Sequence, residues 1–371
     1  MLMRDFIEGR SALSVSLQIA NSILSDSLYN PSYGYFSKQA VIFSPGEPFD
    51  FNSFPDDAAF QREYAKRYTE FEDKLDEQDY NEARQLWHTP TELFRPHYGE
   101  AIARYMVSNY KLSLFPYHDL LIYEMGAGNG TLMLNILDYI RDTDPEVYAR
   151  TRFRVIEVST ALANLQTQQL QRSAAARGHA DKVTIVNQSI FDWTTYVSSP
   201  CFFLALEVFD NFAHDLIRYN PSTEAPLQGI ALIDADGEFF EFDSPHLDPL
   251  AARFLRVRDA ACGSRPYNHP LRGPLPSRLL RNLTSSLPMA YNLSAPEYIP
   301  TRLMNFFDIL REYFPAHKLV TSDFHSLPQA IAGVNAPVVQ TRYKRRTVPV
   351  TTPLVCFPIH CHLGLIICEH S

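Results

Sequence analysis

The segment Leu120-Leu121-Ile122-Tyr123-Glu124-Met125-Gly126-Ala127-Gly128-Asn129-Gly130-Thr131-Leu132 decides the fold of this chain. An apolar run of strand length leads into an acidic residue, then into glycines at alternate positions, and then into an apolar stretch of helical character. This order of strand, glycine turn and helix is typical of a doubly wound α/β sheet, in which a nucleotide lies at the carboxyl end of the strand. The sequence therefore predicts a nucleotide site here.

The glycine spacing indicates which nucleotide. The dinucleotide fingerprint is G-x-G-x-x-G, whereas this turn reads G-x-G-x-G and follows a glutamate. A carboxylate at that place repels a pyrophosphate but suits a cation. S-adenosylmethionine (AdoMet) carries an ammonium and a sulfonium and no phosphate, so we predict that Glu124, Gly126, Gly128 and Gly130 bind AdoMet. The alternative is an ordinary strand–turn–helix with a glycine-rich turn.

Two further strand ends carry acidic residues. Phe153–Ser159 is predicted as a second strand, and its Glu157 is placed to accept from the ribose hydroxyls, although a surface glutamate at a strand tip is the alternative. Val183–Val186 is predicted as a third strand. Asp192 and Trp193 follow it and are predicted to flank the adenine; for Trp193 a place in the core is an equally good interpretation.

The rest of the chain continues the alternation of strands and helices. Cys201–Leu206 is a fourth short apolar strand, Gly229–Phe242 reads as a hairpin, and helices are expected over Ser14–Ser27, Tyr98–Tyr110 and Pro300–Phe314. Short apolar strands separated by helices indicate a mostly parallel sheet covered on both faces. The predicted fold class is α/β, with a Rossmann-like sheet, an N-terminal helical region and inserted segments.

Composition narrows the function classes. The chain has 371 residues, 46% of them hydrophobic and 20% charged, and its net charge of −9 argues against general nucleic-acid binding. No apolar run reaches the roughly 18 residues of a membrane span. The cysteines are few and not paired in close motifs, which favours reduced thiols inside the cell. We see no secretory signal, no clear transit peptide, and in the Cys/His-rich tail no usual zinc spacing, so no metal is predicted.

Two charged segments stand out. Tyr64–Arg84 is mostly acidic and is interpreted as a solvated helix or linker. Arg342–Arg346 is basic and is interpreted as a solvated strand end; contact with RNA or an acidic partner is the alternative. We expect three parts: residues 1–115, helical or irregular with the acidic insertion; 116–355, the AdoMet-binding domain with an insertion at about 245–300; and 356–371, an atypical tail.

Several blocks in order resemble the MidA family, whose mitochondrial members include a complex I assembly factor that is an AdoMet-dependent protein arginine methyltransferase. The blocks that carry the resemblance are Pro31–Phe36, Thr89–Glu92, Tyr98–Glu100, Glu124–Leu132, Ile156–Ser159, Glu207–Asp215 and Gly333–Gln340. Three features depart from the family pattern: Gln85–His88 replaces a G-D-F segment, Leu206 stands where the family often has Asn or His, and the tail Cys356–Ser371 replaces a terminal strand.

The resemblance implies the class I AdoMet-dependent methyltransferase fold, a location in the mitochondrial matrix, and a protein partner that is a respiratory complex I subunit. A guanidinium stays protonated at neutral pH, so its binding site needs carboxylates. We therefore expect Glu207 and Asp210 to hold the guanidinium or shape its pocket. His214 is a candidate proton acceptor, or else a helix-start histidine bonded to the backbone. A catalytically inactive assembly or scaffold protein of the same fold is the alternative function, and a small-molecule or RNA methyltransferase also stays open.

Overall fold

The computed structural model describes residues 16–19, 28–30, 36, 40–82, 84–169, 177–233, 239–262, 270–271, 293–324 and 340–349. Its centre is a five-stranded sheet of order β12-β7-β4-β5-β6, in which every pair is parallel. The chain enters at β4, adds β5 and β6 on one side, and then returns to add β7 and β12 on the other. The order in which strands are added to the sheet therefore reverses between β4 and β7. Sheets of this kind bind ligands at such a point, at the carboxyl ends of the strands.

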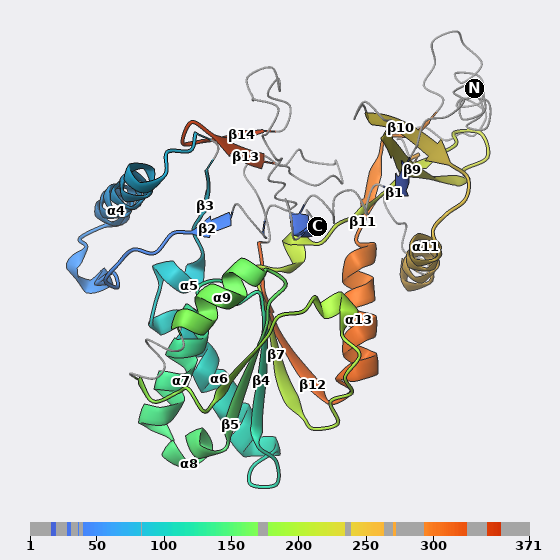
Figure 1. Ribbon diagram of the computed structural model, residues 1–371. Helices are drawn as coiled ribbons and strands as arrows, with labels where there is room; N and C mark the ends of the chain where they lie inside the picture. The colour runs from blue at the N-terminus through green and yellow to red at the C-terminus, as the bar shows by residue number, and fades with distance from the viewer. Residues whose placement is uncertain are drawn as a thin grey trace.

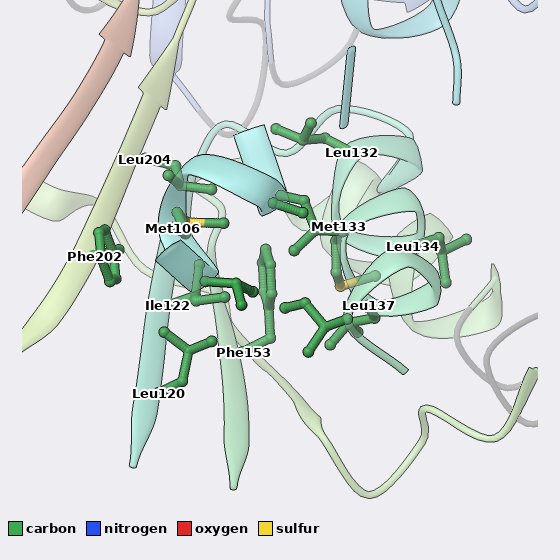
Figure 2. Packing of buried hydrophobic residues seen from close by; sticks show 14 of the residues in the cluster. Met106, Leu120, Ile122, Leu132, Met133, Leu134, Leu137, Phe153, Phe202 and Leu204 are labelled. Atoms are coloured by element: carbon green, nitrogen blue, oxygen red, sulfur yellow. The ribbon is translucent and has the colours of Figure 1, made fainter. Parts of the chain in front are cut away.

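The two faces of this sheet are set by residue alternation along its strands. In β4 (Leu120–Met125), Ile122 packs with Phe153 of β5 and with helices α6 and α7, whereas Tyr123 faces α13 on the other side. Figure 2 shows the first of these cores, in which Met133 and Leu137 of α7 meet the strands. Because both faces are covered, these strands read as nearly continuous apolar runs in the sequence.

Among the remaining elements of the central layers, the predicted strands β5, β6 and β7 and the predicted helices α6 and α13 are present with bounds within a few residues of those expected. Helices cover both sides of the sheet, with α6, α7 and α8 on one and α13 on the other (Figure 1). The bounds are α5 Pro90–Leu93, α6 His97–Ser113, α7 Thr131–Thr143, α8 Pro145–Ala149, β5 Thr151–Ile156, α9 Thr160–Gln169, β6 Val183–Val186, η3 Ile190–Asp192, β7 Cys201–Leu206, η4 Phe209–Asn211, α13 Thr301–Tyr313 and β12 His317–Ser322.

A second, antiparallel sheet follows the central one. Its strands are β1 (Ser16–Ile19), β8 (Asp215–Tyr219), β9 (Pro226–Ile233), β10 (Phe239–Ser244) and β11 (Glu297–Ile299), and β9 pairs with β1, β8 and β10. The β9–β10 pair confirms the predicted hairpin; the residues expected at its turn lie outside the described ones. Helix α11 (Pro249–Cys262), which the sequence reading did not anticipate, packs on this sheet through Ala251 and Leu255.

A third unit, which we call the cap, comprises residues 40–87 together with 340–349. It contains β2 (Ala40–Ile42), η1 (Phe51–Ser53), α4 (Asp57–Gln78), β3 (Gln85–Trp87) and the hairpin of β13 (Gln340–Tyr343) and β14 (Arg346–Pro349). Both the cap and the second sheet lie beyond the end of the central sheet that carries the glycine turn (Figure 1).

Two predictions on local structure were wrong. The expected helix over Ser14–Ser27 is contradicted at Ser16–Ile19, which forms a strand whose backbone pairs with Ile230–Ile233 of β9. A partner strand 211 to 217 positions away in sequence outweighs a short helical pattern, since isolated short helices are marginal. The interpretation of the basic cluster as solvated is contradicted at Arg342, which is 9% exposed and makes an ion pair with Glu72 of α4, whereas Lys344, Arg345 and Arg346 are exposed.

Among the helices that the structure describes, none is long and apolar enough to cross a lipid bilayer.

Candidate functional site

The glycine turn joins β4 to α7, and all of its glycines have left-handed backbone. Their φ angles are 70° at Gly126, 52° at Gly128 and 77° at Gly130, a region that side chains with a Cβ disfavour. A Cβ on Gly128 would also lie 2.6 Å from Cδ1 of Ile42 in β2. The conformation at Gly128 therefore favours glycine, and a larger side chain there would also have to displace the end of Ile42.

Glu92, which the sequence reading did not assign to the site, holds this turn from outside. It is 2% exposed, and its Oε1 accepts hydrogen bonds from Asn129 Nδ2 at 3.1 Å and Thr131 Oγ1 at 2.6 Å. Its Oε2 accepts from Arg95 at 3.1 Å. Thr89 caps the short helix α5 that carries Glu92. The signal in the sequence was the block Thr89–Glu92, which carries the family resemblance.

Glu124 is the most unusual group of the site. Its side chain is 5% exposed, and among the described residues no donor lies within hydrogen-bonding distance of its buried Oε2. Burial, and then the charge of Glu157, raise the pKa of this carboxyl to about 8. A buried acceptor without a donor is costly, so the fold keeps here a group that a cationic donor would satisfy.

Glu157 lies at the end of β5, next to this group, and is 3% exposed. Its Oε1 accepts from the backbone N–H of Ser159 at 2.9 Å, and its Oε2 accepts from Nε2 of Gln166 at 3.1 Å. Burial raises its pKa despite these donors. The structure thus places Glu157 inside the fold, which does not fit the alternative of a surface glutamate.

The end of β7 carries the second acidic group. Glu207 is strained, with φ of 54°, and the side chain of Asp210 in η4 is buried. Burial, with the charges of Asp210 and Asp323, raises the pKa of Glu207 to about 8. Asp323, just past β12, accepts from the backbone N–H groups of Phe209 and Asp210 at 3.0 and 3.3 Å and so fixes η4. The sequence reading missed it, although parallel neighbours end at the same edge.

Tyr29, from the N-terminal segment, contacts the residues that follow β7. Its hydroxyl donates to the backbone carbonyl of Asn211 at 2.9 Å. Burial and the charge of Asp210 raise the pKa of Tyr29. Arg302, at the start of α13, stacks on Phe191 with its Cζ 3.9 Å from the ring centroid, and burial lowers its pKa.

The other three predicted site residues differ in exposure: one is at the surface and two are buried. Asp192 is exposed at the end of η3. Trp193 is 6% exposed, donates its indole N–H to Thr195 O at 2.7 Å and packs on Phe314, which fits the core interpretation. His214 is 2% exposed and directly precedes strand β8, so the helix-start alternative does not describe it.

Comparison with known proteins agrees with this geometry. A family described as putative S-adenosyl-L-methionine-dependent methyltransferases matches residues 101–355. The chain belongs to this family. The match confirms the family and the fold class that the sequence predicted.

Individual relatives are more distant. The chain is 29% identical over 248 residues to the protein arginine methyltransferase NDUFAF7 homolog, mitochondrial, of Schizosaccharomyces pombe; the match covers 65% of this chain and 51% of that protein. It thus spans about half of that relative's length. A crystal structure of an uncharacterized protein from Burkholderia thailandensis has a TM-score of 0.52 at 14% identity, covering 99% of this chain and 70% of that one. At that identity the likeness shows the fold alone.

Proposed function

We propose that this protein is an AdoMet-dependent protein arginine methyltransferase. The observation that carries the proposal is the buried carboxyl of Glu124, whose Oε2 has no donor among the described residues, beside a turn of left-handed glycines at the point where the order of the central strands reverses. A dinucleotide would bring phosphates to this carboxyl, whereas AdoMet would bring an ammonium and a sulfonium. Gly126, Gly128 and Gly130 would line the methionine part, and Glu157 would accept from the ribose.

The residues after β7 suit a cationic acceptor group. When bound, AdoMet supplies an electrophilic methyl group. Glu207 and Asp210 are the carboxyls nearest the end of β7, and an approaching guanidinium would favour the ionised form of Glu207, whose pKa is raised to about 8 by burial. The two carboxylates would hold and orient the guanidinium, which does not lose its proton on its own. A nitrogen that gains a methyl must lose a proton, and His214 is the proposed acceptor.

The substrate and location follow from the named relative and from the resemblance to its family. Since the relative is called a mitochondrial protein arginine methyltransferase, we propose a protein substrate and a mitochondrial location. Within that proposal the substrate is a respiratory complex I subunit, methylated during assembly in the matrix. The net charge of −9 favours a basic protein segment over nucleic acid.

The test separates binding from catalysis. Calorimetric titration with AdoMet should show binding to the wild type and to Glu207→Gln, and no binding to Gly128→Val, in which the added side chain would meet Ile42. Mass spectrometry of a candidate subunit incubated with each protein should then show methylarginine with the wild type only. Glu70→Gln, at an exposed position of α4, is the matched control for the glutamate change.

Each failure has a distinct meaning. Methylarginine that persists with Glu207→Gln would contradict the role given to the β7 edge. AdoMet binding without any protein methylation would favour the alternative, an inactive member of the family that works as an assembly or scaffold protein.

A further inference from the structure

Gln166 is a polar residue at an inward position of α9. Along this helix Ala163 and Gln166, one turn apart, are buried, while Asn164, Leu165, Thr167 and Gln168 are exposed. Gln166 is only 1% exposed. A glutamine on the buried face of an amphipathic helix needs partners for its amide, and those partners identify what it does.

Its amide nitrogen joins two parts of the site. Nε2 donates to the backbone carbonyl of Gly128 at 2.8 Å and to Oε2 of Glu157 at 3.1 Å. Both partners are acceptors, so the amide has one satisfactory orientation, with the nitrogen toward them. The side chain therefore ties the glycine turn after β4 to the acidic residue after β5.

The same orientation leaves the amide oxygen facing away from these partners. Oε1 of Gln166 is buried and has no donor within hydrogen-bonding distance among the described residues. The other unsatisfied buried acceptor next to Glu157 is Oε2 of Glu124. Two buried acceptors that have no donor among the described residues, one on a side chain bonded to Glu157 and one on a side chain that interacts with its charge, indicate a ligand that brings donors with it.

We propose that Gln166 is a cofactor-positioning residue that holds Gly128 and Glu157 as one unit, and that its amide oxygen accepts a hydrogen bond from a ribose hydroxyl of the bound nucleoside. The ligand class is thus a ribonucleoside with both hydroxyls present, one for Glu157 and one for Gln166. The ligand part rests on the proposed function, whereas the link between Gly128 and Glu157 stands on the contacts alone.

The experiment compares Gln166→Met with Gln168→Met, an exposed control on the same helix. Calorimetry with S-adenosylhomocysteine and its 2′-deoxy and 3′-deoxy forms should show binding weakened about 10- to 100-fold in Gln166→Met and unchanged in the control. The wild type should bind one deoxy form less tightly than S-adenosylhomocysteine itself. In Gln166→Met this difference should nearly disappear, because the ribose hydroxyl no longer has Gln166 as its partner. Gln166→Asn, which keeps the amide but cannot reach both acceptors, serves if the methionine variant fails to fold.

A second readout needs no ligand. Since the Gln166 donor lowers the pKa of Glu157, carboxyl NMR titration should show that pKa higher in Gln166→Met than in the control. An unchanged pKa together with unchanged affinities would overturn the inference. Deoxy penalties equal in wild type and variant would overturn the hydroxyl contact. A wild type that ignores S-adenosylhomocysteine would refute the proposed function and the ligand part, while a raised Glu157 pKa would still support the link.

Discussion

Two buried glutamates, Glu72 in the cap and Glu124 in the central sheet, are almost equally hidden, at 4% and 5% exposure, yet their surroundings are opposite. Glu72 accepts from both terminal nitrogens of Arg342, at 2.7 and 3.1 Å, and the backbone of Arg342 is held by the amide of Gln85. Glu124 has an oxygen with no donor among the described residues.

The difference separates a structural charge from a functional one. A buried carboxylate with a bidentate arginine has both oxygens satisfied. The Glu72–Arg342 pair therefore links residues 340–349 to α4 and β3. The buried carboxyl of Glu124, with its pKa raised to about 8, lacks such donors. Its ionised form lowers the stability of the fold until a ligand supplies them.

The largest expected effect on the free energy of unfolding comes from removing the Glu72–Arg342 ion pair. Arg342→Met removes both hydrogen bonds to the buried Glu72 and leaves it only Nε of Arg345 at 3.8 Å, so the free energy of unfolding of the cap should fall by about 3–5 kcal/mol, measured by urea denaturation. Arg345→Met is the comparison, because that side chain is 41% exposed, pairs with Asp73 and Asp76, and approaches Glu72 only to 3.8 Å, so its removal should cost about 1 kcal/mol or less. Equal losses in the two variants would show that Glu72 is not a buried anchor.

A smaller effect of the opposite sign is expected at Glu124. Its folded-state pKa lies above the unfolded value, so the folded protein binds more protons between these values and loses stability as pH rises. From about pH 5 to about pH 9, the wild type should lose roughly 2–4 kcal/mol more unfolding free energy than Glu124→Gln. Thermal or urea unfolding across this range measures the difference, and parallel curves would refute the burial of a titrating carboxyl.

The smallest effect is expected at the strained end of β7. Glu207 has a φ of 54°, which glycine adopts without penalty. Glu207→Gly should therefore raise the free energy of unfolding by about 1 kcal/mol, and it should abolish methyl transfer while AdoMet still binds. The comparison is Glu224→Gly, a half-buried residue with a φ of 59° just after the turn at 221–223; it should gain similar stability and keep activity. Retained activity in Glu207→Gly would exclude Glu207 from the site.

Much of the central layer could be predicted from the sequence because its signals are local. The run Leu120–Met125, the left-handed glycines and the apolar strands Val183–Val186 and Cys201–Leu206 fix strand, turn and sheet by short-range sterics and burial. Acidic residues directly after such strands, among them Glu157 and Glu207, could then be assigned to one edge by topology.

What could not be predicted depends on contacts between distant segments. Arg342 and Glu72 are 270 positions apart, so each charged segment read alone appeared to be solvated. Asp323 and Gln166 gain their roles only when β12 and α9 lie beside β7 and the glycine turn. The strand Ser16–Ile19 likewise exists because β9 offers it a free edge, which nothing in its own pattern reveals.

The central claim, that Glu124 awaits a cationic nucleoside, is tested most directly by AdoMet titration near pH 7 in buffers of different ionisation enthalpy. Because the unliganded carboxyl has a pKa of about 8 and the cation favours its ionised form, binding should release a proton from the wild type and none from Glu124→Gln. A binding enthalpy of the wild type that does not depend on the buffer would show that no proton is released and would contradict the account. So would a folded protein that binds NAD or ATP but not AdoMet.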